Sequence, residues 1–240
     1  MEISELRPGL HLVRIGFGQL YLWRDADTVT VIDTGVAGSG AGIVEAVRSL
    51  GLPPSAIHRI VLTHGHEDHA GSAAEVRSWH GAPVHAHEAD APIVRGDLPR
   101  PEPVLTEVDA PIWAEISALG LPPAPPSPVD VELRDGDELD FAGGARILAV
   151  PGHTAGSVAI HLPAHRVLFT GDTVATAPTG EVILGVFNQD ETRMLAGFHR
   201  LADLDVDTAC FGHGDPVVTG AGPVLRAAVA NHRPRPVRPA

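Results

Sequence analysis

The chain has 240 residues, a length that fits one large domain, and its hydrophobic fraction of 44% excludes a mainly disordered protein. Its 30 Asp and Glu residues outnumber its 17 Lys and Arg residues, so the formal net charge is −13. Such an acidic surface repels phosphate backbones, which argues against nucleic acid as a partner.

The first third of the chain alternates strand patterns with helix patterns. Apolar runs over 19–23 and 28–32 predict a β-hairpin, and helical spacing of apolar residues predicts a helix over 43–50. The elements expected next are a strand over 59–63, a helix over 70–80 and a strand over 83–87. This alternation is typical of mixed α/β proteins.

Residues 91–129 differ in composition because they are rich in proline, and only 112–119 has the pattern of a short helix. A connection of this length is either a lid over a functional site or a flexible insertion. Prolines also alternate with arginines near the C-terminus, which predicts a flexible tail over 232–240.

The second half returns to strands, interrupted by a helix whose apolar face carries Met194, Phe198 and Leu201 and closed by another near 224–230. The expected strands are 129–133, 146–150, 157–162, 167–170 and 208–211. Strands and helices in both halves predict a mixed α/β sandwich that forms one domain over 1–240.

The densest chemistry is the run HGHEDH at positions 64–69, directly after the predicted strand 59–63. Neutral imidazoles and carboxylates are ligands for zinc and related divalent ions. The competing interpretation makes Asp68 a helix N-cap and the histidines ordinary surface residues. That interpretation suits a single histidine, whereas the cluster favours a metal site.

Three more candidate ligands follow apolar runs in the second half: His153, Asp172 and His213. Each lies next to a glycine, which lets the backbone bend tightly at the end of a strand. Singly, each has an equally good interpretation as a polar loop residue. Together with the first cluster they provide enough imidazoles and carboxylates for two ions that share one carboxylate.

These segments resemble the successive motifs of the metallo-β-lactamase-fold hydrolase superfamily, in the family's order. The matching runs are DTG at 33–35, THGHEDHAG at 63–71, PGHT at 151–154, GDT at 171–173 and GHG at 212–214. The resemblance extends from about Leu12 to Leu225. It implies a four-layer αβ/βα sandwich with the metal site at one edge, between the two sheets.

The resemblance also implies a role for each candidate residue. It assigns His64, His66 and His153 to one ion, Asp68, His69 and His213 to a second, and Asp172 to both. Asp68 would in addition be catalytic, because its counterpart in the family orients the attacking hydroxide. The implied cofactors are two divalent ions, with zinc favoured and iron or manganese as alternatives.

Two cations that share a water lower its pKa to near neutrality and produce a hydroxide that attacks a carbonyl. We therefore expect hydrolysis of a carboxylic ester, thioester or lactone of a small molecule. Glyoxalase II has the same ligand positions but a further helical domain, and only 214–240 follows His213 here. Quorum-quenching lactonases carry a Tyr soon after the bridging Asp, and 173–187 contains none.

Other activities on the same scaffold remain as alternatives. The first is a mononuclear iron enzyme that resembles persulfide dioxygenases, with overlapping ligands. A β-lactamase is disfavoured by Asp172, since the zinc β-lactamases have Cys there or lack the bridging Asp, and Cys210 lies in the wrong segment. A phosphodiesterase and a non-catalytic metal-binding protein are the remaining alternatives.

Residues around the ligands have less specific patterns. Glu67 is expected to face solvent, and Asp33 either orients a ligand loop or caps its own turn. The candidates for apolar pocket walls are Ile112, Trp113, Leu119 and Phe187. Because the N-terminus lacks the pattern of a signal peptide and no apolar run is long enough for a membrane helix, we expect a cytoplasmic protein without a membrane partner.

Overall fold

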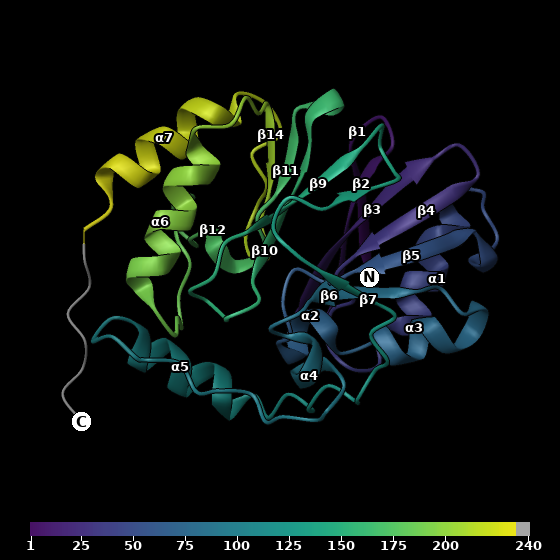
Figure 1. The fold of residues 1–240 in the computed structure, drawn as a ribbon, viewed down its shortest axis with the longest axis horizontal. Coiled ribbons are helices and arrows are strands. Elements are labelled where there is room, and N and C mark those ends of the chain that lie inside the picture. The colour runs from purple at the N-terminus through teal and green to yellow at the C-terminus, as the bar shows by residue number, and fades with distance from the viewer. Residues whose placement is uncertain (234–240) are drawn as a thin grey trace.

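A computed structural model describes residues 1–233 and contains two facing β-sheets with helices on both outer sides (Figure 1). The first sheet has the strand order β1-β2-β3-β4-β5-β6-β7 and the second β14-β11-β10-β9-β8. A small third sheet pairs β12 (Val174–Thr176) with β13 (Val182–Leu184).

The first sheet begins as antiparallel hairpins and continues as parallel strands from β4 to β7. Its strands are β1 (Glu2–Arg7), β2 (Leu10–Ile15), β3 (Gly18–Asp25), β4 (Thr28–Ile32), β5 (Ile57–Val61), β6 (Val84–His87) and β7 (Val131–Leu133). Helices α1 (Gly40–Ser49) and α3 (Ala73–His80) cover its outer face, because Ile43 and Val47 of α1 and Val76 of α3 share a buried cluster with the strands. Parallel strands need such crossover helices.

The second sheet is antiparallel except for β11 and β14, which run parallel. Its strands are β8 (Glu138–Leu139), β9 (Ala145–Ala149), β10 (Val158–Leu162), β11 (Val167–Phe169) and β14 (Thr208–Cys210). Helices α6 (Glu191–Ala202) and α7 (Ala221–Asn231) cover its outer face. The predicted apolar face of α6 is confirmed, since Met194, Phe198 and Leu201 are fully buried.

Between the sheets, Tyr21, Trp23 and Ile32 of the first pack in one cluster with Ile160 and Phe169 of the second. Helices, sheet, sheet and helices thus form four successive layers (Figure 1). The expected mixed α/β four-layer sandwich is confirmed.

The structure contains strands that were not predicted, among them the short strands β8, β12 and β13, and it divides one predicted helix. Strands β1 and β2 were not predicted, because their alternating polar residues and the turn at Pro8-Gly9 hide the period. The predicted helix 70–80 is divided into α2 (Glu67–Ala70) and α3. At Gly71, between them, a Cβ would collide with the backbone of Val36 and Ala37, so this close approach requires glycine.

The proline-rich segment 91–129 contains α4 (Ala91–Val94) and α5 (Asp109–Ala118), which confirms a short helix near 112–119. Figure 1 shows α5 at the lower edge of the molecule, between the part that carries α6 and the part that carries α4. Short 3-10 turns occupy Pro54–Ala56, Pro163–His165 and Gly171–Thr173. Within residues 1–233, no helix has both the length and the hydropathy needed to cross a bilayer. Most of the predicted tail 232–240 lies outside the described residues.

Candidate metal centre

The direction of the strands brings the predicted ligands to one edge of the molecule. Asp33 and His64 follow the carboxyl ends of the parallel strands β4 and β5. Strands β9, β11 and β14 also run in one direction, because β10 is antiparallel to both β9 and β11, and their carboxyl ends lead to His153, Asp172 and His213. Carboxyl ends of strands with the same direction meet at one edge of a sheet.

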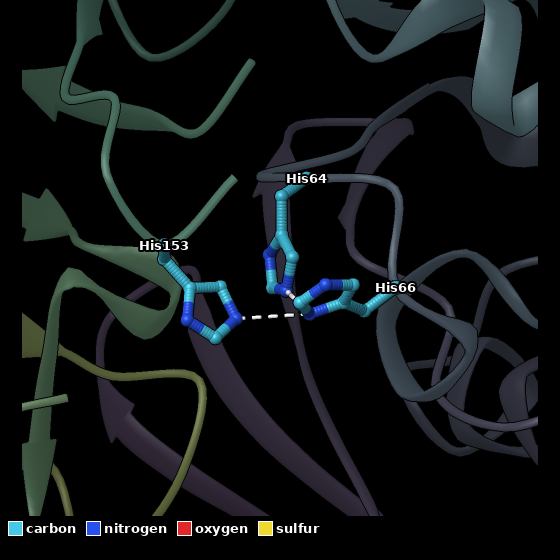
Figure 2. A group of neighbouring side chains, drawn as sticks. All are labelled: His64, His66 and His153. Atoms are coloured by element: carbon cyan, nitrogen blue, oxygen red, sulfur yellow. Dashed lines mark hydrogen bonds between the residues drawn. The ribbon is translucent and has the colours of Figure 1, made fainter. Parts of the chain in front are cut away.

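Three histidines form the first group of possible ligands, and their ring nitrogens point toward one another (Figure 2). The distance from His66 Nδ1 is 3.1 Å to His64 Nε2 and 2.9 Å to His153 Nε2. The ligand atoms of each such group lie within 4.8 Å of one another. This spacing suits a single cation that contacts all three imidazoles.

Two more groups overlap with the first. They consist of His64, His69 and Asp172, and of Asp68, His69 and His213. The carboxylate of Asp172 lies between the group that contains His153 and the group that contains His213. Its Oδ2 is 3.4 Å from His153 Nε2 and 3.3 Å from His213 Nε2. Asp68 Oδ2 lies 3.2 Å from His213 Nε2. The structure therefore brings all the predicted ligands together around Asp172.

The donor set fits a divalent cation. His69 Nε2 and Asp172 Oδ1 are buried and make no hydrogen bond within residues 1–233, although they lie 3.2 Å apart. A buried polar atom without a partner costs about 1–3 kcal/mol, and a metal ion would satisfy both atoms. At Gly212 a Cβ would collide with Asp172 Oδ1, so glycine is required for the His213 loop to approach this carboxylate.

The electrostatics of the cluster separate neutral from charged groups. Burial lowers the pKa of His64 and of His66 well below the usual value, so these imidazoles are neutral at pH 7. Burial also opposes the charged form of His213, but Asp172 and Asp68 outweigh it and raise the pKa of His213 to about 10. The pKa of Asp172 is well below its usual range despite burial, because His213 and His69 stabilise the carboxylate.

Asp33 orients the ligand loop, residues 64–69, through three contacts. Its carboxylate accepts hydrogen bonds from the Thr63 backbone N–H (2.7 Å) and the Thr63 hydroxyl (2.8 Å), and it lies 2.9 Å from His69 Nδ1. Because the carboxylate is the acceptor, Nδ1 of His69 carries the proton and Nε2 is directed at the cluster. Of the two roles expected for Asp33, these contacts match the orientation of the ligand loop.

Asp90 is a positioning residue that the sequence interpretation missed. Its buried carboxylate accepts hydrogen bonds from the backbone N–H groups of Gly65 and Gly156 and from the Thr154 hydroxyl, each at 2.8 Å. It thereby ties the loop that contains His64 to the loop that contains His153. Asp90 lies just beyond the carboxyl end of β6, next to β5 in the sheet, and this position was the available signal.

A cavity of about 760 Å³ opens directly over the cluster, and His66, Asp68, His153, Asp172 and His213 form part of its wall. Three of the four residues predicted as apolar walls, Ile112, Trp113 and Phe187, line this cavity. The fourth prediction was wrong: Leu119 is not among the lining residues and is 58% exposed, because it follows the last turn of α5 on the outer side.

The expectation for Glu67 was also wrong. Instead of facing solvent, its carboxylate lines the cavity and accepts two hydrogen bonds from Arg100 Nη1, at 2.8 and 2.7 Å. Arg100 belongs to the proline-rich segment, whose position relative to the motif could not be read from the sequence.

Comparison with known families matches residues 13–213 to the metallo-beta-lactamase superfamily, most of the chain and all the candidate ligands. The chain belongs to the metallo-beta-lactamase superfamily. This membership agrees with the resemblance of its motifs and with the four-layer fold.

Several proteins are similar to this superfamily member in sequence. It is 32% identical over 156 residues to a hydroxyacylglutathione hydrolase of Fuscovulum blasticum, a match that covers 64% of this chain and 47% of that enzyme. It is 30% identical to a hydroxyacylglutathione hydrolase of Cereibacter sphaeroides over 80% of this chain and 61% of that enzyme. The chain therefore spans about half to three fifths of the length of these relatives. The Bacillus subtilis protein YflN is 25% identical over 89% of this chain and 86% of its own.

Solved structures of the superfamily have the same fold. A metallo-beta-lactamase family protein of Thermus thermophilus superposes with a TM-score of 0.68 at 28% identity, covering 94% of this chain and 78% of that one. A metallo-beta-lactamase of Cronobacter sakazakii superposes with a TM-score of 0.72 at 21% identity, covering 96% and 94%. At that identity the second likeness supports the fold alone.

Proposed function

We propose that this chain is a metal-dependent hydrolase that cleaves a carboxylic ester, thioester or lactone of a small molecule. The observation that carries the proposal is the overlap of three groups of possible ligands, which share His64 and His69, beneath one cavity. Such a site, with ligands on one side and an open cavity on the other, is typical of catalytic rather than structural metal centres.

Two divalent ions fit this donor set, and zinc suits its imidazoles and carboxylates. We assign His64, His66 and His153 to one ion, Asp68, His69 and His213 to the other, and Asp172 to both. When bound, the ions lower the pKa of a water molecule and polarise the carbonyl of the substrate.

Asp68 is the proposed catalytic residue. Its side chain is 17% exposed and lines the cavity, so one oxygen can accept a hydrogen bond from a water molecule while Oδ2 faces His213. That hydrogen bond aims the water oxygen at the carbonyl carbon of a substrate in the cavity.

The reaction consumes only the substrate and one water molecule. The water oxygen bonds to the carbonyl carbon, and the bond from that carbon to the leaving oxygen or sulfur breaks. One proton of water ends on the leaving alcohol or thiol, and the other stays with the carboxylic acid product until it ionises. The names of the hydroxyacylglutathione hydrolase relatives support the thioester among these substrates.

Metal quantification on protein purified without added metal, paired with an ester, thioester and lactone panel, tests the proposal. We expect two zinc ions per chain and turnover that a chelator abolishes and zinc restores. A single iron ion with oxygen consumption on a persulfide would instead support the dioxygenase alternative. Undiminished hydrolysis after complete removal of divalent ions would contradict the proposal.

A further inference from the structure

Helix α5 turns one apolar face toward the cavity over the metal centre. Ile112, Trp113 and Ile116 occupy helical spacing on that face, and all three line the cavity. The helix buries only Asp109, so these apolar side chains keep part of their surface exposed: Ile112 is 40% exposed, and the other two are half-buried. An apolar group that enters the cavity would cover surface that the protein leaves uncovered.

The apolar wall continues beyond α5. Ile183 and Phe187 line the same cavity, and the ring centroid of Phe187 lies 5.0 Å from that of Trp113, so the two rings are in contact. Phe187 has a left-handed backbone with φ of +61°, which a bulky residue adopts only where its surroundings hold it. The two aromatic rings therefore join α5 to the β13–α6 loop at the cavity.

Polar contacts hold the proline-rich segment that carries α5 against two neighbouring loops. The Val104 backbone N–H donates to the carbonyl of Asn188 at 2.9 Å, beside Phe187. On the other side Arg100 donates to both oxygens of Glu67, and its guanidinium lies 5.6 Å from the Trp113 ring centroid. The apolar wall is thus attached to the ligand loop and to the loop after β13.

Away from the proposed metal ions, the charged side chains around the cavity disfavour an anionic group on the substrate chain. Arg100 is the only Lys or Arg among the described residues that line it, and Glu67 already neutralises it. Asp215, which also lines the cavity, is paired with Arg14 at 2.7 Å. The exposed carboxylate of Glu115 adds a further negative charge. A carboxylate on the substrate would meet these acidic groups and would have to break the Glu67–Arg100 pair.

The geometry points to an uncharged ester, thioester or lactone with an apolar chain as the substrate class, the chain lying along the wall that Ile116, Trp113 and Phe187 form together. This inference rests on the proposed function and narrows it. It also separates this chain from enzymes for glutathione thioesters, because glutathione carries two carboxylates, and away from the metal centre the described residues that line the cavity include no unpaired Lys or Arg to receive them.

The test is a series of p-nitrophenyl esters of acetate, butyrate, hexanoate and octanoate, assayed with the zinc-loaded protein. We expect kcat/KM to rise at least tenfold from acetate to hexanoate, within the limit of roughly fourfold per methylene that complete burial allows. The matched charged probe is p-nitrophenyl hydrogen adipate, the same six-carbon chain ending in a carboxylate. We expect at least a tenfold lower kcat/KM for adipate than for hexanoate, and S-lactoylglutathione to be poorer still.

Two variants test whether the apolar chain of the substrate lies in the cavity. Trp113→Ala should flatten the rise of kcat/KM with chain length, and Ile116→Ala should do so more weakly and serves if Trp113→Ala does not fold. Leu119→Ala, at the end of the same helix but outside the cavity, is the control and should keep the wild-type chain-length ratio. Equal ratios in Trp113→Ala and Leu119→Ala would overturn the placement.

The outcomes distinguish this inference from the proposed function. Metal-dependent hydrolysis of all the esters with no chain-length effect, or with a preference for adipate, overturns the inference and leaves the function standing. If no ester, thioester or lactone is hydrolysed, the proposed function fails. Calorimetric binding of octanamide, compared with suberamate, the same chain ending in a carboxylate, then decides the inference. Tighter binding of octanamide supports it, and equal or weaker binding overturns it.

Discussion

Asp33 and His69 are 36 positions apart in the chain, yet the carboxylate of the first lies 2.9 Å from Nδ1 of the second. Both side chains are almost completely buried. The contact fixes which ring nitrogen of His69 is directed at the cluster, and Asp33 also holds Thr63 beside His64.

Asp33→Ala should therefore weaken metal binding without removing a ligand. Loss of the residue that orients a metal-binding histidine reduces affinity about 10–100-fold. Competition with a chromophoric chelator measures the change, and Asp27→Ala in the exposed β3–β4 turn is the matched control. Equal zinc affinity in the two variants would contradict the orienting role.

Asp90→Ala should destabilise the whole fold as well as the site. The substitution leaves the buried N–H groups of Gly65 and Gly156 without their acceptor, at about 1–3 kcal/mol for each group. Urea unfolding should show a loss of about 2–6 kcal/mol together with a lower zinc content. Asp97→Ala, an exposed carboxylate nearby, should stay within about 0.5 kcal/mol of wild type.

His66→Ala or Asp172→Ala should lower zinc content and hydrolysis together while the far-ultraviolet circular dichroism spectrum stays native. Both residues belong to the groups of possible ligands, and the hydrophobic clusters of the fold do not include them. Added zinc should raise the Tm of the wild-type protein more than that of either variant, since a bound ligand stabilises only the state it binds. Normal turnover in either variant would rule out the ligand assignment.

The Arg77–Asp130 pair predicts a pH-dependent part of the stability. The hydrogen bonds from Arg77 lower the pKa of Asp130 to about 2. Because the pKa is depressed in the folded protein, this stabilisation is complete above the unfolded pKa of about 4 and disappears as the pH falls toward 2. Arg77→Met should reduce the free energy of unfolding by about 0.5–1 kcal/mol at pH 7, since the pair is partly exposed. The difference from wild type should shrink below pH 4, and a constant difference down to pH 2 would contradict this origin.

The sequence by itself predicted the hairpin β3–β4, the helices α1, α6 and α7, and the edge where the candidate ligands gather. These predictions succeed because they depend on local patterns: the period of apolar residues, glycines at turns, and histidines packed into one short run. The order of the motifs along the chain also indicated the superfamily.

The tertiary structure decided what long-range contacts control. Asp90 gains its role only because β6 lies beside β5 and thereby brings its carboxylate to Gly65 and Thr154. Glu67 turned toward the cavity because Arg100, from a segment without regular periodicity, folds back onto it. Which apolar residues of α5 face the metal centre depends likewise on where the proline-rich segment crosses the cavity, and no local pattern encodes that path.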